Sequence, residues 1–183
     1  KVLRPATYNA TLTAIDLDRG GQSGIELLAE LPNLRSVVFN EFGPYSVDLE
    51  ALSKVTQLTS LNLHGLNEGD LSALAKLTNL EDLGLSGVGL SNQVPLDISP
   101  ISGLTKLKSL DLGYVVISDG TPLASLTQLE NLSLHGATIG STTPILSLTN
   151  LRSLDLSSTQ ITTIFNLAPF TKLTNLDISY NTF

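Results

Sequence analysis

A leucine pattern that recurs at a nearly fixed interval constrains this chain more than any other feature of its sequence. Within residues 150–167, Leu151, Leu154 and Leu156 form an LxxLxL motif, and the next motif begins at Leu173. The first leucine of the motif occupies eight positions: Leu12, Leu34, Leu58, Leu80, Leu107, Leu129, Leu151 and Leu173. The intervals are 22, 24, 22, 27, 22, 22 and 22 residues, so the second repeat has two extra residues and the fourth has five. Self-similarity at such a period predicts a repeat solenoid.

Each LxxLxL motif is predicted to form a short β-strand, because leucines two residues apart point to the same face of a strand. Stacking the eight strands in parallel buries this leucine face and leaves the opposite face to solvent. We therefore expect an α/β fold, a right-handed solenoid with eight parallel strands on its concave face and short helices or 3₁₀ turns on its convex face.

The segments that return from one strand to the next differ along the chain. In the first three, apolar residues at helical spacing follow a candidate N-cap, which predicts short helices. These N-caps are Ser23, Asp48 and Asp70. The later returns contain a proline near their start, which favours a single 3₁₀ turn. These prolines are Pro100, Pro122, Pro144 and Pro169. The convex side is thus expected to become less helical toward the C-terminus.

Three segments carry a resemblance to a known family. LTNLEDLGLSGVGL, LTQLENLSLHGATI and LTNLRSLDLSSTQITTIFNLAPFTKL resemble leucine-rich repeats. The 22-residue period, with Thr before the strand, is similar to the bacterial internalin type and to the related phosphatase-regulator type. The resemblance covers about residues 10–183, and its motif is highly specific for the fold and weakly specific for function. It implies a scaffold that binds other molecules.

The leucine pattern also predicts the domain organisation. Residues 12–183 are expected to form one leucine-rich repeat domain with eight registers, the last of them truncated. Residues 1–11 lack the pattern and are expected to be a partial N-terminal cap or the end of a preceding repeat. A solenoid needs a polar cap over its terminal repeat. Because the pattern stops inside a repeat, either the protein continues beyond Phe183 or another subunit covers this end, and we expect a fragment of a longer chain.

The ninth position of the repeat departs from the family pattern, which usually has Asn there to tie neighbouring turns together. In this chain the position holds Gly20, Phe42, Leu66, Val88, Val115, Ala137, Thr159 and Asn181. Bare buried backbone groups would cost about 1–3 kcal/mol each. We therefore expect water or local turns to satisfy them, with looser or differently shaped turns in the middle repeats.

Function is expected to depend on the solvent-facing strand side chains, at the third, fifth and seventh positions counted from the first leucine. These positions hold six carboxylates and no Lys or Arg. Of the 17 acidic residues, the other eleven nearly balance the ten basic ones, so the net charge of −7 is concentrated on this face.

The candidate partner-binding residues lie on the concave face and at its edge. They are Asp16, Asp18, Asn40, Asn62, His64, Asp82, Asp111, Tyr114, Asn131, His135, Asp155, Asp177 and Tyr180. An acidic groove of this kind would accept a basic or amide-rich protein surface, with charge steering the encounter. The alternative is that Asp at the fifth position, common in this repeat type, only solvates an exposed strand.

Two carboxylate pairs raise the question of a bound cation. Asp16 and Asp18 share one face of a strand, and Asp155 and Asp177 lie on adjacent strands about 4.8 Å apart. Ca²⁺ prefers six or more oxygen ligands, and only two can be named at each pair. No metal site and no cofactor are predicted.

Aromatic residues and insertions mark further candidate contacts. Tyr114 and Tyr180 follow the seventh position, where a tyrosine can anchor a partner or simply cover the edge of the sheet. Phe42 occupies a core position and is expected to be buried, and Tyr45 lies in the two-residue insertion. The five-residue insertion centres on residues 92–96, which makes SNQVPLD a candidate contact loop or a neutral insertion.

Composition and motifs exclude several functions. The pI near 4.6 opposes binding to a phosphate backbone. The absence of Cys excludes disulfides and thiolate chemistry. His64 and His135 lie three repeats apart, too far to share a metal or a substrate atom. No catalytic motif is present, and no apolar run approaches the length of a membrane span. We predict that the chain is not an enzyme and does not insert into a membrane.

The leading hypothesis is a protein-binding module of a secreted or surface-displayed bacterial protein, which holds its partner on the acidic concave face. One alternative is an intracellular regulatory scaffold that docks to an enzyme, as the phosphatase-regulator resemblance implies. Another is a structural spacer in a larger multidomain protein, which would separate a distant catalytic or anchoring domain.

Overall fold

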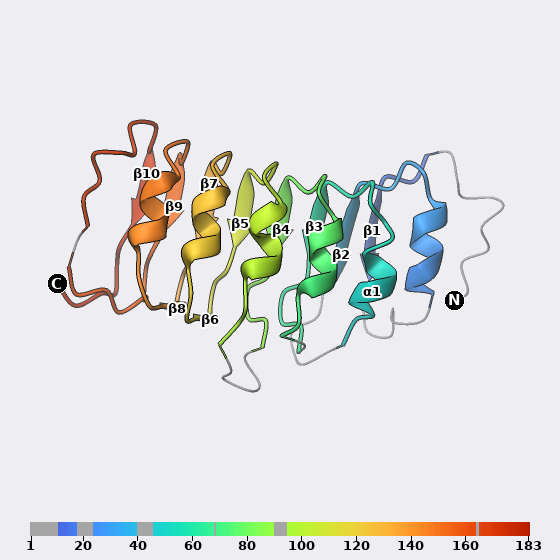
Figure 1. The fold of residues 1–183 in the computed structure, drawn as a ribbon, viewed down its shortest axis with the longest axis horizontal. Helices are drawn as coiled ribbons and strands as arrows, with labels where there is room; N and C mark the ends of the chain where they lie inside the picture. The colour runs from blue at the N-terminus through green and yellow to red at the C-terminus, as the bar shows by residue number, and fades with distance from the viewer. Residues whose placement is uncertain (1–10, 18–23, 40–45, 68, 90–94, 164) are drawn as a thin grey trace.

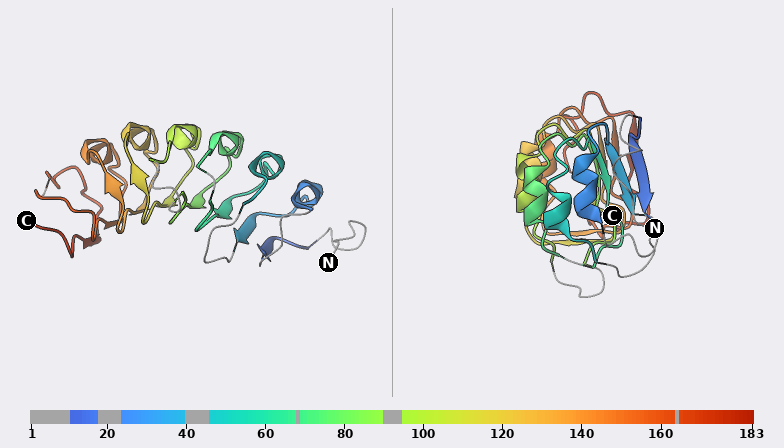
Figure 2. Two further views of the ribbon diagram at one scale, coloured as in Figure 1. Left: turned by 90° about the horizontal axis from the view of Figure 1, so that it is seen from below. Right: turned by 90° about the vertical axis from the view of Figure 1, so that its right-hand side faces the viewer.

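The computed structural model describes residues 11–17, 24–39, 46–67, 69–89, 95–163 and 165–183 of the chain. The strands form one eight-stranded parallel sheet in chain order, and each return segment lies on the opposite side of the coil (Figure 1). Seen from below, the coils follow an arc, with the sheet on the inner side and the helical segments on the outer side (Figure 2). The predicted solenoid is confirmed.

The eight strands of the main sheet coincide with the LxxLxL motifs. They are β1 (Ala14–Leu17), β2 (Ser36–Phe39), β3 (Ser60–Asn62), β4 (Asp82–Gly84), β5 (Ser109–Asp111), β7 (Asn131–Ser133), β9 (Ser153–Asp155) and β10 (Asn175–Asp177). Each motif pairs with its equivalent in the next repeat; Leu61, for example, lies opposite Leu83. Two further strands, β6 (Val116–Ile117) and β8 (Thr138–Ile139), form a separate parallel pair. The eight predicted registers are therefore confirmed.

The convex side is mostly 3₁₀-helical. Its segments are η2 (Ile25–Glu30), α1 (Leu49–Leu52), η3 (Ser72–Lys76), η4 (Ser99–Gly103), η5 (Thr121–Ser125) and η6 (Thr143–Ser147). Of the three predicted N-caps, Asp48 accepts a hydrogen bond from the Ala51 amide at 2.8 Å and begins the α-helix. Asp70 bonds the Ser72 amide instead, at 2.9 Å, so it forms a tight turn before η3. Ser23 lies outside the described residues.

Two predictions about these returns are wrong. The first and third returns are 3₁₀ segments rather than α-helices; α1 lies in the repeat with two extra residues, which gives the return more length. The segment at Pro169 forms no 3₁₀ helix. Two successive turns replace it, in which Phe170 N donates to Leu167 O at 3.0 Å and Leu173 N donates to Phe170 O at 3.1 Å.

The leucine side chains form one continuous core between the sheet and the return segments. Leu58, Leu80 and Leu107 are 0% exposed, and each fully buried leucine contributes roughly 1.5–3 kcal/mol. At the ends of the sheet this burial decreases, because β1 and β10 have a neighbour on one side only; Leu176 on β10 is 36% exposed. Packing between coils, rather than within one coil, holds the fold together.

The ninth position is filled by apolar side chains in the middle repeats. Leu66, Val88, Val115 and Ala137 are all buried. The amides of Leu66, Val88 and Ala137 each donate to the carbonyl three residues earlier, at 3.2, 3.1 and 2.9 Å. The prediction that local turns satisfy these groups is confirmed in these three repeats. Gly20 and Phe42 lie outside the described residues.

The last two repeats retain a polar tie between neighbouring coils. The Asn181 side-chain amide donates to Leu156 O at 2.8 Å and to Ile178 O at 2.9 Å, and its oxygen accepts from Ile161 N at 3.1 Å. The Thr159 hydroxyl donates to the same Leu156 carbonyl at 2.7 Å. This is the cross-coil tie expected of Asn at the ninth position.

The insertions are only partly described. Phe42 and Tyr45 lie outside the described residues, as does most of the five-residue insertion. At the end of that insertion Leu96 is 4% exposed, and its amide donates to Val116 O at 2.7 Å, so this part of the predicted contact loop packs into the core. Within the described ranges, no helix has the length and apolar character to cross a membrane.

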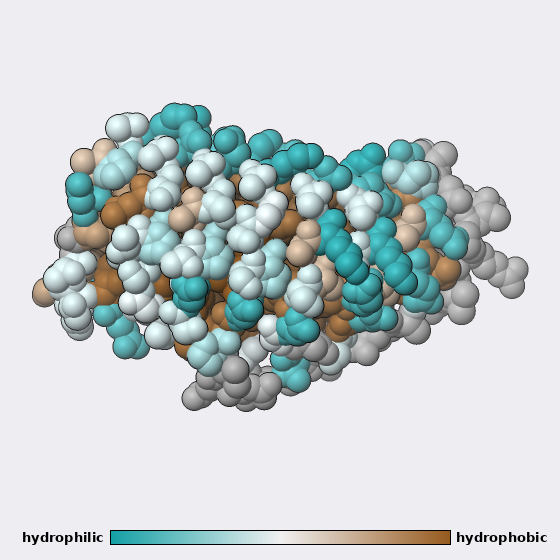
Figure 3. Space-filling model, in the orientation of Figure 1, coloured by the Kyte–Doolittle hydropathy of each residue, from teal (hydrophilic) through white to brown (hydrophobic). Residues whose placement is uncertain are grey.

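The surface of the convex side is unevenly polar. Strongly hydrophilic side chains gather over the helical segments of the amino-terminal repeats and along the two long edges of the solenoid (Figure 3). Paler, less polar residues cover the later return segments in the same view. The concave face is on the far side of this view.

Candidate functional site

The concave face consists of the third-, fifth- and seventh-position side chains of the repeats. Strand register places the fifth positions in one row across the sheet. That row runs Asp16, Val38, Asn62, Gly84, Asp111, Ser133, Asp155 and Asp177. With Asp82 at a third position, the described part of this face has five carboxylates and no Lys or Arg. Two of the predicted site residues on this face, Asp18 and Asn40, lie outside the described residues.

The fifth-position side chains also end the strands. In four repeats the Oδ1 atom at this position accepts a hydrogen bond from the backbone amide two residues later. The pairs are Asn62 with His64 at 3.0 Å, Asp111 with Gly113 at 2.9 Å, Asp155 with Ser157 at 2.9 Å, and Asp177 with Ser179 at 2.8 Å. Asp and Asn favour such turns. Part of the acidic row is therefore explained by backbone structure, and the second carboxylate oxygen lies outside these turns.

His64 reaches over a strand to contact a carboxylate. It follows β3, and its Nε2 lies 3.3 Å from Oδ2 of Asp111 on β5. Between them, on β4, stands Gly84, where an added Cβ would lie 2.5 Å from the His64 Nε2. That nitrogen is enclosed and makes no well-directed hydrogen bond, so the contact is an ion pair only when the His64 ring is protonated. The missing side chain at Gly84 makes the pair possible.

Asp111 is held in its ionised form. Burial raises the pKa of Asp111, but the His64 side chain, the Gly113 amide and the Ser133 hydroxyl lower it more, so the pKa lies below its ordinary value. Asp82 shows the opposite behaviour. Burial and the neighbouring Glu81 raise the pKa of Asp82, against a smaller lowering by Lys108. Because the pKa of Asp111 is lowered and that of Asp82 is raised, the two carboxylates change the pH dependence of the fold's stability in opposite senses.

The second histidine belongs to a chain of hydrogen bonds over three repeats. The Tyr114 hydroxyl lies 2.7 Å from Nε2 of His135, and Nδ1 of His135 lies 2.6 Å from the Ser157 hydroxyl. That hydroxyl donates to Oδ1 of Asp155 at 2.5 Å. Ser157 is 3% exposed, so it positions the histidine and is not accessible as a nucleophile. Each predicted histidine is thus joined to a carboxylate. His64 contacts Asp111 directly, and His135 is joined to Asp155 through Ser157.

Tyr114 adopts an unusual backbone conformation. Its φ is 59°, and in the described repeats the eighth position always has positive φ, which favours Gly. The residues there are Gly65, Gly87, Tyr114, Gly136, Ser158 and Tyr180. Holding a tyrosine in this conformation costs about 1–2 kcal/mol. The ring crosses the next repeat at Gly136, where an added Cβ would lie 2.8 Å from it, and it remains 51% exposed.

A shallow groove lies over β9 and β10 at the carboxyl-terminal end of the sheet. It has a volume of about 410 Å³, and Asp155 and Asp177 lie in register in its lining. Hydrogen bonds from Ser179 lower the pKa of Asp177, and His135 adds to this effect. Within the described ranges no group of three or more His, Cys, Asp or Glu residues could hold a metal ion. The groove is an anionic surface open to solvent.

The remaining predicted residues are not joined to these clusters. Asp16 lies on β1, at the opposite end of the row from Asp177. Asn131 on β7 is exposed, and Tyr180 is 85% exposed at its positive φ of 56°. The structure therefore brings together His64 with Asp111 and Asn62, and Tyr114 with His135 and Asp155. Asp177 lies beside Asp155 in the groove, and the other described candidates are separate exposed groups.

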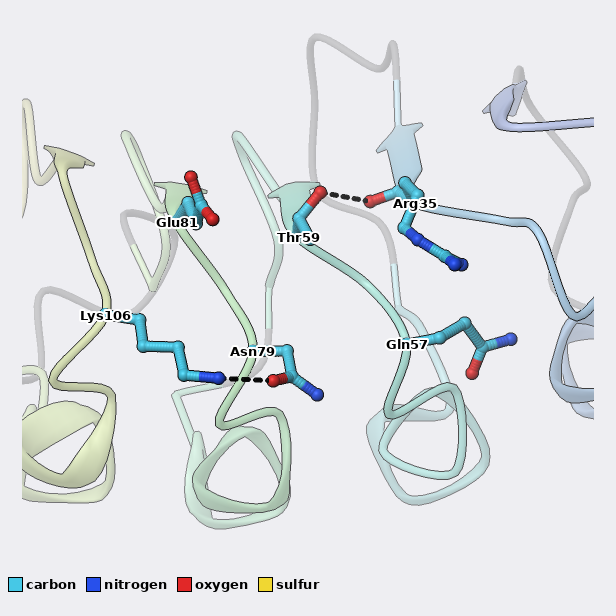
Figure 4. Close-up of a pocket in the computed structure, with 6 residues that line it drawn as sticks. All are labelled: Arg35, Gln57, Thr59, Asn79, Glu81 and Lys106. Carbon is cyan, nitrogen blue, oxygen red and sulfur yellow. Dashed lines mark hydrogen bonds between the residues drawn. The ribbon is translucent and has the colours of Figure 1, made fainter.

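A pocket on the flank of the solenoid was not predicted. It has a volume of about 310 Å³ and precedes the strands rather than lying on the concave face (Figure 4). Its lining residues are Arg35, Gln57, Thr59, Asn79, Glu81 and Lys106. Lys106 bonds Asn79 at 2.7 Å, and Lys108 pairs with Glu81 at 2.6 Å. The sequence signal that could have found this pocket is the set of charged and amide residues directly before and after the first leucine of successive repeats.

Comparisons with known proteins agree with this architecture. Residues 149–183 match the family described as leucine-rich repeats in two copies. No curated protein sequence matches the chain. The leucine-rich repeat ectodomain of a plant membrane receptor kinase from Arabidopsis thaliana has 23% identity and a TM-score of 0.64, and 84% of this chain covers 19% of that one. At this identity it shows the fold alone. The fold of the chain is that of a leucine-rich repeat solenoid.

Two solved structures narrow the type of repeat. An internalin from Listeria monocytogenes is 37% identical with a TM-score of 0.72, and 86% of this chain covers 44% of that one. Internalin C2 from the same species is 29% identical with a TM-score of 0.73, and 94% of this chain covers 69% of that one. The solenoid is internalin-like, and the chain spans less than half of the first relative. Leucine-rich repeat domains commonly bind proteins and are generally not enzymes.

Substituting Gly84 tests the pair that crosses β4. Gly84→Ala should destabilise the fold by about 1–3 kcal/mol, because the new methyl group displaces the His64 ring. In a His64→Ala background the same change should cost much less. Urea unfolding of the four proteins of this double-mutant cycle measures the difference. Equal costs in both backgrounds would show that His64 does not occupy the space over Gly84.

Acid unfolding tests the ionised state of Asp111. Because its folded pKa lies below the unfolded value of about 3.9, Asp111 adds stability that is present above that pH and is lost as the pH falls through the folded pKa. Asp111→Asn should therefore be less stable at neutral pH and show a shallower loss of stability below about pH 4. Asp82→Asn is the matched control and should shift the acid limb in the opposite sense. Denaturant midpoints between pH 2 and pH 7 report both, and an Asp111→Asn curve parallel to that of the wild type would contradict the assignment.

Proposed function

We propose that this chain is the protein-binding module of a secreted or surface-displayed bacterial protein, and that it holds a basic protein partner on its concave face and the adjoining edge. The observation that carries this proposal is the charge of the face, where the described residues include five carboxylates and no Lys or Arg. The internalin-like solenoid supports the bacterial surface location.

The acidic row fits a basic partner better than a purely structural role. A structural role explains the Oδ1 atoms of Asp111, Asp155 and Asp177, each of which ends a strand. It does not require that the seventh and third positions also lack Lys and Arg, and in the described part of this face they do. Elsewhere three carboxylates are paired with a Lys or Arg side chain: Glu50 with Lys76 at 2.6 Å, Glu81 with Lys108 at 2.6 Å and Glu130 with Arg152 at 3.2 Å. Unbalanced negative charge on one face speeds the encounter with a basic protein.

The edge of the face supplies the aromatic part of the site. Tyr114 and Tyr180 are large, exposed rings at positive φ, bordering the row of carboxylates. Interfaces concentrate their binding energy in a few residues, and Tyr is frequent among them. We place Asp111, Asp155 and Asp177 as the charged contacts, with Tyr114 and Tyr180 as aromatic contacts beside them. A phosphate backbone would be repelled by the same row.

Peptide selection tests this proposal through the chemistry of the partner alone. A displayed random-peptide library selected on the wild-type protein should enrich Lys- and Arg-rich sequences. The triple variant Asp111→Lys, Asp155→Lys and Asp177→Lys should lose at least tenfold in affinity for those peptides, since it reverses the charge of the row.

The matched control makes the same change of charge at three aspartates that lie outside the concave face. Asp70, Asp97 and Asp119 are exposed residues before η3, η4 and η5. Changing all three to Lys should leave peptide affinity within about threefold of the wild type. Enrichment of acidic or uncharged peptides, or equal loss in both triple variants, would overturn the assignment of the concave face.

A further inference from the structure

The hydrogen bonds around His135 have only one consistent direction when the ring is neutral. The Ser157 hydroxyl has one proton, and it donates that proton to Asp155 at 2.5 Å. Its contact with His135 must then be donation from Nδ1–H to the serine oxygen, at 2.6 Å. A neutral imidazole has one N–H, so Nε2 is an acceptor. The Tyr114 hydroxyl, 2.7 Å away, therefore donates to Nε2.

Protonation of His135 reverses only the outer bond of this chain. The added proton goes to Nε2, because Nδ1 already carries one, and Nε2–H then donates to the Tyr114 oxygen. The phenol proton must turn away from the ring. Nothing else moves, since Ser157 and Asp155 keep their bonds. The exposed hydroxyl of Tyr114 thus changes from a group that accepts hydrogen bonds from outside to one that donates them.

Protonation of His135 also changes the charge of the concave face, and this change opposes a basic partner as well. The carboxylates that face it are Asp155, through Ser157, and Asp177 on β10, while Asp111 lies in the repeat of Tyr114. The other imidazole, His64, pairs with Asp111. No described Lys or Arg lies on this face. A proton on His135 therefore places a positive charge among the carboxylates that would hold a basic partner.

We propose that Tyr114 and His135 determine the partner chemistry of the concave face: with His135 neutral the pair selects Lys or Arg side chains, and with His135 protonated it releases them. This inference rests on the function proposed above. A lysine ammonium or arginine guanidinium only donates hydrogen bonds, so it matches the outward oxygen of Tyr114 in the neutral state. In the protonated state it meets another donor and a like charge.

Imidazole ¹⁵N chemical shifts test the chain of hydrogen bonds itself. In the wild type at pH 7.5, His135 should be the Nδ1–H tautomer with an unprotonated Nε2. Tyr114→Phe should move the His135 Nε2 resonance and leave that of His64 unchanged. A dominant Nε2–H tautomer in the wild type would overturn the inference, whether or not any peptide binds.

Binding of a defined peptide tests the consequence. The probe is a peptide of alternating Lys and Gly, titrated into the protein at constant ionic strength. The wild type should bind it at least about threefold more weakly at pH 5.5 than at pH 7.5. This is the order of effect expected for one unit charge near a bound cation in water. His135→Gln, which stays neutral, should lose most of this difference. His64→Gln, at the same position on another repeat, should retain it. Tyr114→Phe should weaken binding at pH 7.5 and narrow the difference.

The outcomes separate the two proposals. Absence of binding by the wild type at both pH values would overturn the proposed function, and the ¹⁵N measurement would still decide the hydrogen-bond chain. Binding that is equal at both pH values, or a pH dependence that survives in His135→Gln, would overturn this inference and leave the acidic site in place. Circular dichroism at both pH values controls for folding of each variant.

Discussion

The burial of leucine side chains between neighbouring coils is the interaction on which the rest of this structure depends. A single coil has too little apolar surface to fold alone, so each repeat is stable only when its leucine face is covered by the repeats beside it. This requirement sets the strand register, because leucine must lie opposite leucine along the sheet. Once the register is set, the opposite face of the sheet has side chains in fixed rows. The position of every candidate contact on the concave face follows from the core.

The fixed rows allow side chains to interact across several repeats. His64 contacts Asp111 two strands away only because Gly84 between them has no side chain. Similarly, Tyr114 reaches His135 by lying across Gly136. In both cases a glycine in one repeat creates the space that a larger residue from a neighbouring repeat occupies. Rigid spacing makes such complementarity possible, and it also gives the concave face a defined shape before a partner arrives.

Much of the fold could be predicted from the sequence because a period of 22 residues is a strong constraint. The eight strands and their register followed from the leucines alone. The return segments were predicted less well, since a single hydrogen bond separates α from 3₁₀ geometry, as the different bonding of Asp48 and Asp70 shows. At the site, the acidic row was predictable by counting positions. Its second role in ending strands, through bonds such as Asp177 to Ser179, required backbone geometry.

The histidines show the limit of reading positions one at a time. Their spacing of three repeats predicts two isolated groups, and they do lie apart. The structure shows that each is joined to a carboxylate, His64 across Gly84 and His135 through the buried Ser157. Neither connection can be derived from spacing, because both depend on side-chain orientation, and the second also depends on Ser157 donating its hydroxyl proton to Asp155. The flank pocket escaped prediction for a related reason, since its lining comes from positions on either side of the strand start.

The central claim is that the acidic concave face is a binding surface and not only the solvated side of a sheet. The most direct measurement is a map of amide chemical-shift changes as a selected basic peptide is added to the ¹⁵N-labelled protein. The largest changes should fall on β5, β7, β9 and β10 and on the turns that contain Tyr114, His135 and Tyr180. Changes confined to the convex segments or to the flank pocket would contradict the claim while leaving the leucine-rich repeat fold intact.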